Sequence, residues 1–369
     1  MAQDTTHSSF QLLRDLKNLV AKKFHRLSGI FSSDIGIDLG TANTLVFVRG
    51  KGIVLAEPSV VAVDSLTNEV LAVGHKAKAM LGKTPRKIHA VRPMKDGVIA
   101  DFEIAEGMLK ALIKRVTPTR SLFRPRILIA VPSGITGVEK RAVEDSALHA
   151  GAQEVVLIEE PMAAAIGARL PIHEAVANVI VDMGGGTTEV AVISMGGLIA
   201  SRSLRIAGDK LTDDILRYLR EERNLLIGEA TAENLKINYG SAYPLEEEVE
   251  GRVRGRDLVS GLPKEITITS EELREAMQRS IKSIVLAVKN TIEETPPELT
   301  ADLINRHIFL AGGGALLKGL DKLIAQETKL FVKIVDDPLT AVARGCGFVL
   351  ENIDQWRPVL VSTEKEAYL

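Results

Sequence analysis

Two stretches of the chain repeat one pattern of apolar and polar positions. In Asp34–Val48 and again in Val179–Ile193, an apolar run ends in an aspartate, an apolar residue and glycine, a threonine follows, and a second apolar run begins. Short β-rich apolar runs on both sides of a glycine turn predict two strands joined as a β-hairpin. We therefore expect two similar hairpins, with Asp38 and Asp182 at their mouths, about 140 positions apart by subtraction.

The remaining pattern predicts alternating strands and helices, and hence an α/β fold. The further strands are expected at Ile53–Leu55, Val60–Val63, Val70–Val73, Arg126–Val131, Val155–Ile158, Glu265–Thr269 and His307–Ala311. Helices are expected over 76–81, 103–115, 138–150, 159–166, 209–222, 228–239, 270–294 (with Ser270 as N-cap) and from Asp337 to about Asn352. Ser241–Gly261 is charged and is expected to be irregular, and the polar tail Asp354–Leu369 is expected to fray.

The leader, residues 1–31, carries a helical pattern before the first strand. Its apolar positions are spaced by three or four: Phe10, Leu13, Leu16, Val20, Phe24 and Leu27. Basic residues interleave with them, and Asp15 is the only acid between Phe10 and Phe31. A basic amphipathic helix is typical of a membrane surface, although most amphipathic helices pack on their own protein. The lopsided charge favours membrane attachment.

A second apolar pair, Leu122 and Phe123, falls in an expected loop flanked by arginines. Such a pair either packs inward as a turn or forms a second membrane contact, and both readings stay open.

Composition narrows the function classes. The 369 residues suit two large domains, and the net charge of −2 gives no basic field for nucleic acid. Cys346 is the only cysteine, which excludes a disulfide framework and suits a reducing cytoplasm. No apolar run approaches the 18 residues of a transmembrane helix.

The residue types in the two hairpins suit phosphate and Mg²⁺. Glycines bring backbone N–H groups close to a ligand, and threonines add donors for phosphate oxygens. Carboxylates at the strand ends, Asp38 and Asp182, can hold Mg²⁺ through water. The alternative, two ordinary hairpin turns, is made less attractive by the repetition itself.

Two other turns carry candidate chemistry. Glu159-Glu160-Pro161 opens a helix, where a carboxylate that points into a cleft could orient the water that attacks a γ-phosphate. Gly312-Gly-Gly-Ala315 follows a strand and would let a flat ring or a phosphate approach the backbone, although a bare strand-to-helix connection would also explain it.

In this order, the signals Asp38–Thr44, Ile158–Ile166, Val179–Val190, Phe309–Leu317 and Asp337–Gly347 resemble the five nucleotide-site motifs of the actin, Hsp70 and sugar kinase ATPase superfamily. Within it, the chain resembles the MreB family of bacterial actins over roughly residues 33–353. The stretches that carry this closer resemblance are Asp38–Thr44, Arg92–Asp101, Ile158–Gly167, Ile227–Ala232 and Asp337–Gly345. The leader is longer than the short N-terminal segment usual in the family.

The resemblance implies an actin-like ATPase fold of two RNase-H-like domains, each with a smaller inserted subdomain, closing over ATP and Mg²⁺. It implies domain I at 32–174 plus 344–358 with a subdomain near 54–96, domain II at 175–343 with a subdomain near 211–270, and a tail at 359–369. The implied catalytic and metal residues are Glu160, Thr187 and Asp182, with Asp38 and Asp182 on the metal side through water. The implied nucleotide contacts are Thr41, Ala42, Asn43, Gly184, Gly185 and Gly186 for phosphate, and Ala232, Glu233, Asn234, Leu235, Lys236, Gly312, Gly313, Gly314 and Ala315 for adenosine.

By the same resemblance, the protein would be a slow ATPase that polymerises into antiparallel paired filaments on the inner face of the cytoplasmic membrane. It would bind anionic lipid, work with cell-shape membrane proteins such as MreC, MreD and RodZ, and guide peptidoglycan synthesis. Two alternatives use the same ATPase core. A soluble sugar or acetate kinase would need a polar substrate pocket that nothing in 50–96 or 211–270 declares, and an Hsp70-type chaperone would need a peptide-binding domain.

Overall fold

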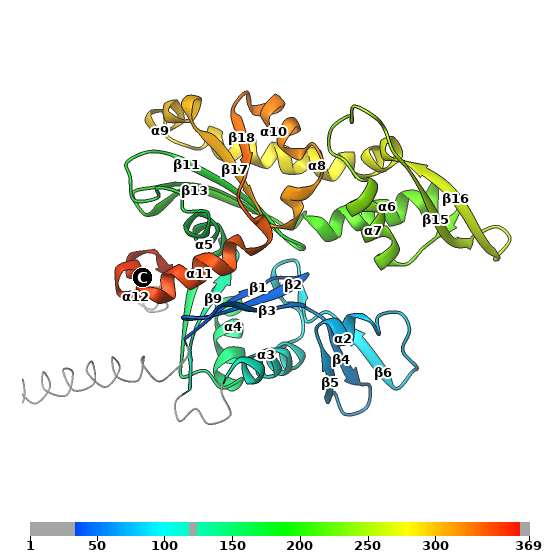
Figure 1. Ribbon diagram of the computed structural model, residues 1–369, viewed down its shortest axis with the longest axis horizontal. Coiled ribbons are helices and arrows are strands. Elements are labelled where there is room, and N and C mark those ends of the chain that lie inside the picture. The colour runs from blue at the N-terminus through cyan, green and yellow to red at the C-terminus, as the bar shows by residue number, and fades with distance from the viewer. Residues whose placement is uncertain (1–33, 118–123, 362–369) are drawn as a thin grey trace, which may run out of the picture.

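The computed structural model of the chain describes residues 34–117 and 124–361. They form two lobes, each built on a large sheet with helices packed against it and each extended by a small three-stranded sheet (Figure 1). The expected α/β fold class is confirmed. The leader, the pair Leu122 and Phe123, and residues 362–369 lie outside the described residues, so the expectations for them stay predictions.

The two large sheets repeat one topology. The first lobe has the order β19-β10-β9-β1-β2-β3, and the second has β13-β12-β11-β17-β18. In both, a hairpin and a third antiparallel strand are followed by two parallel neighbours, so β1 and β11 hold equivalent places. The first sheet comprises β1 (Ile35–Leu39), β2 (Asn43–Val48), β3 (Gly52–Pro58), β9 (Arg126–Val131), β10 (Glu154–Glu159) and β19 (Leu360–Val361). The second comprises β11 (Asn178–Met183), β12 (Thr188–Ser194), β13 (Gly197–Leu204), β17 (His307–Ala311) and β18 (Phe331–Ile334).

Helices cover each sheet, and two lie between the lobes (Figure 1). The first lobe carries α3 (Phe102–Val116) and α4 (Gly137–His149); α5 (Glu160–Gly167) and α11 (Ala341–Glu351) lie between the lobes. The second lobe carries α6 (Gly208–Glu221), α7 (Glu229–Tyr239), α8 (Ser270–Glu293), α9 (Pro297–Asp302) and α10 (Leu320–Thr328).

Each lobe is extended by a small sheet. The one in the first lobe joins β4 (Val61–Asp64), β5 (Val70–Val73) and β6 (Ile88–Val91) and carries the short helix α2 (His75–Lys78). A two-stranded ribbon, β7 (Met94–Lys95) and β8 (Val98–Ile99), leads back to the large sheet. In the second lobe, the small sheet joins β14 (Leu225–Leu226), β15 (Glu250–Asp257) and β16 (Pro263–Thr269).

The cores explain why the lobes stay together. Each lobe has its own apolar cluster, and a further cluster lies between them, made by α5, α11 and the facing sides of both sheets. The backbones of α5 and α11 touch where they cross. A Cβ at Gly345 would lie 1.8 Å from the carbonyl oxygen of Ala163, and a Cβ at Gly167 would lie 1.8 Å from that of Ala341. Only glycine allows two helices to approach this closely.

The charged segment expected to be irregular was predicted wrongly, because Ser241–Gly261 contains strand β15. Along this strand, buried Gly251 and Val253 alternate with exposed arginines. The alternation of a half-buried strand is therefore present, but glycine supplies one of its inward positions and the arginines dominate its composition.

Two further expectations at element ends were also wrong. The residues that cap α8 are Thr269 and Glu272, which form a capping box, whereas Ser270 is the first helical residue. The chain also stays ordered past residue 353, through α12 (Ile353–Trp356) and a 3₁₀ turn, Arg357–Val359. Strand β19 then pairs antiparallel with β10, so the expected frayed tail does not begin at residue 354.

Candidate functional site

The glycine turns of the two hairpins face and touch each other across the gap between the lobes. A Cβ placed on Gly185 would lie 2.6 Å from the Cβ of Ala42, and one on Gly186 would lie 2.4 Å from Oγ1 of Thr41. The sequence predicts phosphate binding at both turns. The structure brings the two turns together, and glycine is the only residue that permits so close an approach.

A third element, the turn Asp96–Gly97, lies between the two hairpins. The N–H of Gly97 donates a hydrogen bond to Oγ1 of Thr41 over 3.0 Å. A Cβ on Gly97 would lie 2.6 Å from Cγ2 of Thr187, and the φ of 79° at Gly97 also favours glycine. The turn therefore contacts both hairpins. Sequence reasoning assigned it no role, although Asp-Gly is a strong turn signal.

Three carboxylates lie around these turns: Asp182 and Glu160 are buried, and Asp38 is half-buried. Asp38 and Asp182 occupy the carboxyl ends of β1 and β11, and Glu160 is the first residue of α5. Burial raises the pKa of Asp38 to about 7, and burial with the charge of Asp38 raises the pKa of Asp182 to about 7. The pKa of Glu160 is raised well above its usual range by burial and then by the charges of Glu189, Asp182 and Asp38. A cation would be needed to keep all three ionised.

The donor set fits a magnesium ion held through water. Oδ1 of Asp182 is buried and has no hydrogen-bond partner, so it is an oxygen that a hydrated cation could satisfy. Among the described residues, no group of three or more His, Cys, Asp or Glu could bind a metal directly. Mg²⁺ suits such a site because it keeps several of its waters and accepts only one or two carboxylates.

A fourth carboxylate, that of Glu189, was not anticipated. It stands opposite Asp182 in the hairpin and is 1% exposed. Its Oε2 accepts a hydrogen bond from the N–H of Ser133 in the first lobe over 3.2 Å, and its Oε1 accepts one from Oγ of Ser203 over 2.6 Å. Burial raises the pKa of Glu189 to about 7. The signal in the sequence was a charged residue inside an apolar strand.

The adjacent residues Glu159 and Glu160 differ in how deeply their side chains are buried. Glu159 is the N-cap of α5, is half-buried and makes no side-chain cap bond, whereas Glu160 is buried on the side of Asp38 and Asp182. Pro161 occupies the first turn, as expected for a helix start. Of the two glutamates, Glu160 is therefore the one placed to act in the cleft.

The first expected adenosine segment, Ala232–Lys236, lies on α7 and presents two different faces. Ala232 and Leu235 are buried in the core of the second lobe, so their side chains cannot contact a nucleotide. Nζ of Lys236 lies 2.7 Å from the Glu233 carboxylate and donates to the carbonyl oxygen of Gly208 over 2.7 Å. Asn234 is exposed. Of the five residues expected to contact adenosine in this segment, only Glu233, Asn234 and Lys236 therefore have side chains outside the core.

The second expected adenosine segment, Gly312–Ala315, follows β17 and forms a 3₁₀ turn at Gly313–Leu316. A Cβ on Gly312 would lie 2.6 Å from Oδ1 of Asp182, and one on Gly314 would lie 2.2 Å from Cγ of Met183. Ala315 is buried in the core. The second lobe's own packing thus explains two of the three glycines, and the turn lies directly beside Asp182.

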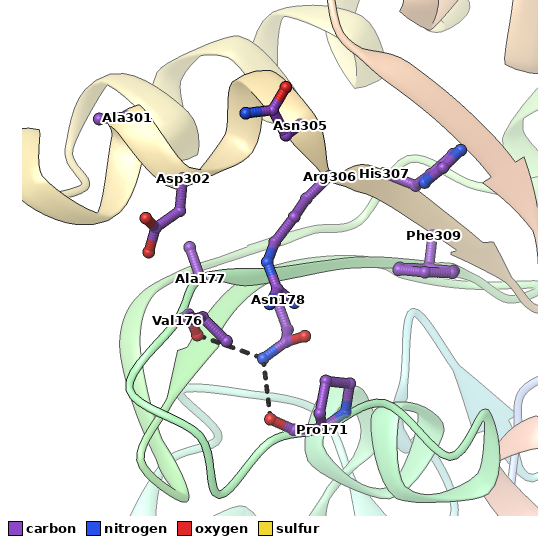
Figure 2. Close-up of a pocket in the computed structure, with 10 residues that line it drawn as sticks. All are labelled: Pro171, Val176, Ala177, Asn178, Ala301, Asp302, Asn305, Arg306, His307 and Phe309. Atoms are coloured by element: carbon purple, nitrogen blue, oxygen red, sulfur yellow. Dashed lines mark hydrogen bonds between the residues drawn. The ribbon is translucent and has the colours of Figure 1, made fainter.

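A separate hollow of about 570 Å³ lies at the opposite end of the second lobe's sheet, near the starts of β11 and β17 and the end of α9 (Figure 2). Nδ2 of Asn178 donates to the carbonyl oxygens of Pro171 and Val176 on its floor. Because the glycine turns follow the carboxyl ends of these strands, this hollow is distinct from the site between the hairpins.

The sequence profile of the MreB/Mbl protein family matches residues 32–358. The chain belongs to this family. Among its curated relatives, the cell shape-determining protein MreB of Escherichia coli is 54% identical over 349 residues, which cover 93% of this chain and 99% of that protein. The cell shape-determining protein Mbl of Bacillus subtilis is 51% identical and covers 88% of this chain and 98% of its own length. The predicted MreB resemblance is confirmed.

Solved structures of the MreB/Mbl family and its neighbours confirm the actin-like fold. MreB5 of Spiroplasma citri bound to AMPPNP superposes with a TM-score of 0.83 at 40% identity, covering 88% of this chain and 97% of that one. The same protein bound to ADP gives the same TM-score and identity. A MamK double helical filament has a TM-score of 0.74 at 21% identity, covering 86% of this chain and 98% of that chain, and shares the fold.

Proposed function

We propose that the cleft between the two hairpins binds ATP with Mg²⁺ and hydrolyses it slowly. The observation that carries this proposal is the contact of the two glycine turns beside the buried carboxylates Asp182 and Glu160 and the half-buried Asp38. The nucleotide complexes of Spiroplasma citri MreB5 support it, because that protein has the same fold at 40% identity.

Each group in the cleft would have a distinct role. Backbone N–H groups of 41–43 and 185–186 would bind phosphate oxygens, whereas the N–H of Gly184 already donates to the carbonyl oxygen of Thr187 over 2.9 Å. Asp38 and Asp182 would hold Mg²⁺ through water. The bound ion would neutralise charge on the phosphates. Glu160, ionised once that positive charge is present, would accept a proton from the attacking water, and Thr187 would help to orient this water. Glu233, Asn234 and Lys236 would lie beside the adenosine.

We further propose that the chain assembles head to tail into filaments. The turn between β15 and β16 exposes three aliphatic side chains, Leu258, Val259 and Leu262, and lies at one extreme of the second lobe (Figure 1). The hollow of Figure 2 lies towards the opposite extreme, by α9. A contact between two different surfaces at opposite ends would generate an open polymer rather than a closed dimer.

The filaments would lie on the inner face of the cytoplasmic membrane. No helix in residues 34–117 and 124–361 is long and apolar enough to cross a bilayer. Attachment is assigned to the leader because its amphipathic pattern is lopsidedly basic, with Leu122 and Phe123 as the second candidate. The homologues named cell shape-determining proteins support a role in cell shape. We propose that the filaments fulfil it by directing peptidoglycan synthesis, together with membrane proteins such as MreC, MreD and RodZ.

Electron microscopy of the full chain with ATP and Mg²⁺, with and without anionic vesicles, tests the proposal. We expect membrane-bound filaments in the presence of vesicles. Val259→Glu should abolish filaments while leaving ATP binding intact, because it places a charge on the proposed contact. The control Val138→Glu changes an equally exposed valine on α4, 81% against 84% exposed, and should polymerise normally. Discrete particles that still hydrolyse ATP would refute the filament and favour a kinase.

A further inference from the structure

The segment Arg92–Gly97 touches the second lobe at both of its ends, although it belongs to the first lobe. It leaves β6, passes through β7 and turns at Asp96–Gly97 into β8. This stretch supports the family resemblance, yet the proposed chemistry gives it no role.

At the first end, Arg92 forms two ion pairs across the cleft. Its Nη1 lies 3.3 Å from Oδ2 of Asp209, and its Nη2 lies 2.5 Å from Oε1 of Glu229. These two acids stand in the first turns of α6 and α7. One planar guanidinium can serve two carboxylates at once, which a lysine ammonium cannot do with the same fixed geometry.

Asp209, one of the two partners of Arg92, is itself hydrogen-bonded to the glycine turn of the second hairpin. The N–H of Asp209 donates to the carbonyl oxygen of Gly185 over 2.8 Å. At the other end of the segment, the N–H of Gly97 bonds Thr41, and Gly97 packs against Thr187. The segment Arg92–Gly97 thus contacts both hairpins. Its ion pair with Asp209 binds it to the second lobe beside the second hairpin.

We propose that Arg92 is a positioning residue for the nucleotide: its ion pairs hold the Asp96–Gly97 turn between the two phosphate hairpins and slow the release of bound nucleotide. The inference rests on the proposed ATP site. In this proposal the nucleotide leaves when the lobes separate, and separation must break the bonds of Arg92 to Asp209 and Glu229 because these acids belong to the other lobe.

The size of the effect follows from the exposure of the pairs. The side chain of Arg92 is 28% exposed and those of Asp209 and Glu229 are 35% and 51% exposed, so solvent weakens each pair. Loss of both pairs should therefore accelerate release by about three- to tenfold. Raising the ionic strength should accelerate release from the wild type in the same direction.

The test measures dissociation of a fluorescent ATP analogue with Mg²⁺ from the full chain, chased with excess ATP. Arg92→Ala should release the analogue faster and lose most of the salt dependence. Glu229→Gln should give a smaller acceleration, and the double variant should release no faster than Arg92→Ala, because Glu229 acts through Arg92. Thermal unfolding without nucleotide should change little.

Arg115→Ala is the matched control. Arg115 pairs with Glu57 over 2.8 Å and is 37% exposed, but both residues belong to the first lobe. Its loss should leave release at the wild-type rate. Release from Arg92→Ala at the wild-type rate, or equal acceleration by Arg115→Ala, would overturn the role of Arg92. A wild-type protein that never holds the analogue would overturn the nucleotide site itself, and this inference with it.

Discussion

Glu160 is the single side chain on which the proposed hydrolysis depends most directly. Glu160→Ala should lower ATP turnover by about 100-fold or more, since a positioned general base contributes roughly 10²–10⁴. ATP binding should persist, because the phosphate-binding groups are backbone N–H groups of other residues. Turnover of a radiolabelled substrate and equilibrium binding measure the two effects. Glu159→Ala, at the half-buried neighbour, is the control, and unimpaired hydrolysis by Glu160→Ala would remove the residue from its role.

Glu189 gives the nucleotide-free protein a pH dependence whose sign is fixed by burial. Its pKa is raised from 4.5 to about 7, so the folded state binds the proton more tightly than the unfolded chain does. The stabilisation is present below about pH 4.5 and is lost as the pH rises through 7. In thermal unfolding between pH 5 and 8, the wild type should therefore lose more stability than Glu189→Gln. Parallel curves for the two proteins would contradict this prediction.

The sequence indicated candidate site residues only where neighbouring residues define the element in which they stand. Asp38, Asp182 and Glu160 could be chosen because each ends or begins an element that its neighbours define. Glu189 could not, because its partners Ser133 and Ser203 come from a loop in the other lobe and from the next strand, and their approach depends on how the lobes pack.

The crossing of α5 and α11 is the element-scale feature most sensitive to substitution. A methyl group at Gly345 would meet the carbonyl oxygen of Ala163 at 1.8 Å, which forces the two helices apart. Gly345→Ala should destabilise the fold by about 1–3 kcal/mol or more, as overpacking does. Chemical denaturation measures the loss. Gly50→Ala is the control, because nothing lies within 4 Å of a Cβ there; its positive φ of 75° should cost only about 1 kcal/mol.

Helices and strands could be predicted where the spacing of apolar residues was regular. The prediction failed where glycine or charged residues interrupted that spacing. The strand β9 was predicted at its observed bounds, Arg126–Val131, because all but its first residue are buried. Strand β15 was missed because Gly251 takes one of its buried positions. Strand β19 was missed because its two residues, Leu360 and Val361, are too few to show a periodic pattern. They form a strand only because they pair with β10.

At the scale of the whole molecule, the repeated motif predicted two similar hairpins, and the family resemblance implied two domains of one fold. The two large sheets have matching strand order. What the motif could not supply was the contact between the repeats. The approach of Gly185 to Ala42 depends on the apolar cluster between the lobes, whose members come from both halves of the chain.

Membrane attachment is likewise a property of the whole chain. Deletion of residues 1–31 should release the protein from anionic vesicles, because each lysine or arginine near the surface contributes about 1 kcal/mol. Nucleotide binding should be unchanged, since the hairpins lie outside the deleted leader. Vesicle co-sedimentation and analogue binding measure the two effects. Full vesicle binding after the deletion would transfer the attachment to Leu122 and Phe123.

The close crossing of α5 and α11 also determines how far other parts of the molecule move if the two lobes rotate about it. The contact at Ala163 lies three residues from Glu160, which is about 4.5 Å along a helix. A rotation about this crossing would therefore displace Glu160 much less than the distant β15–β16 turn, which would move through a far longer arc. Nucleotide turnover could thus change the outline of the proposed polymer contact while Glu160, the proposed base, moves little.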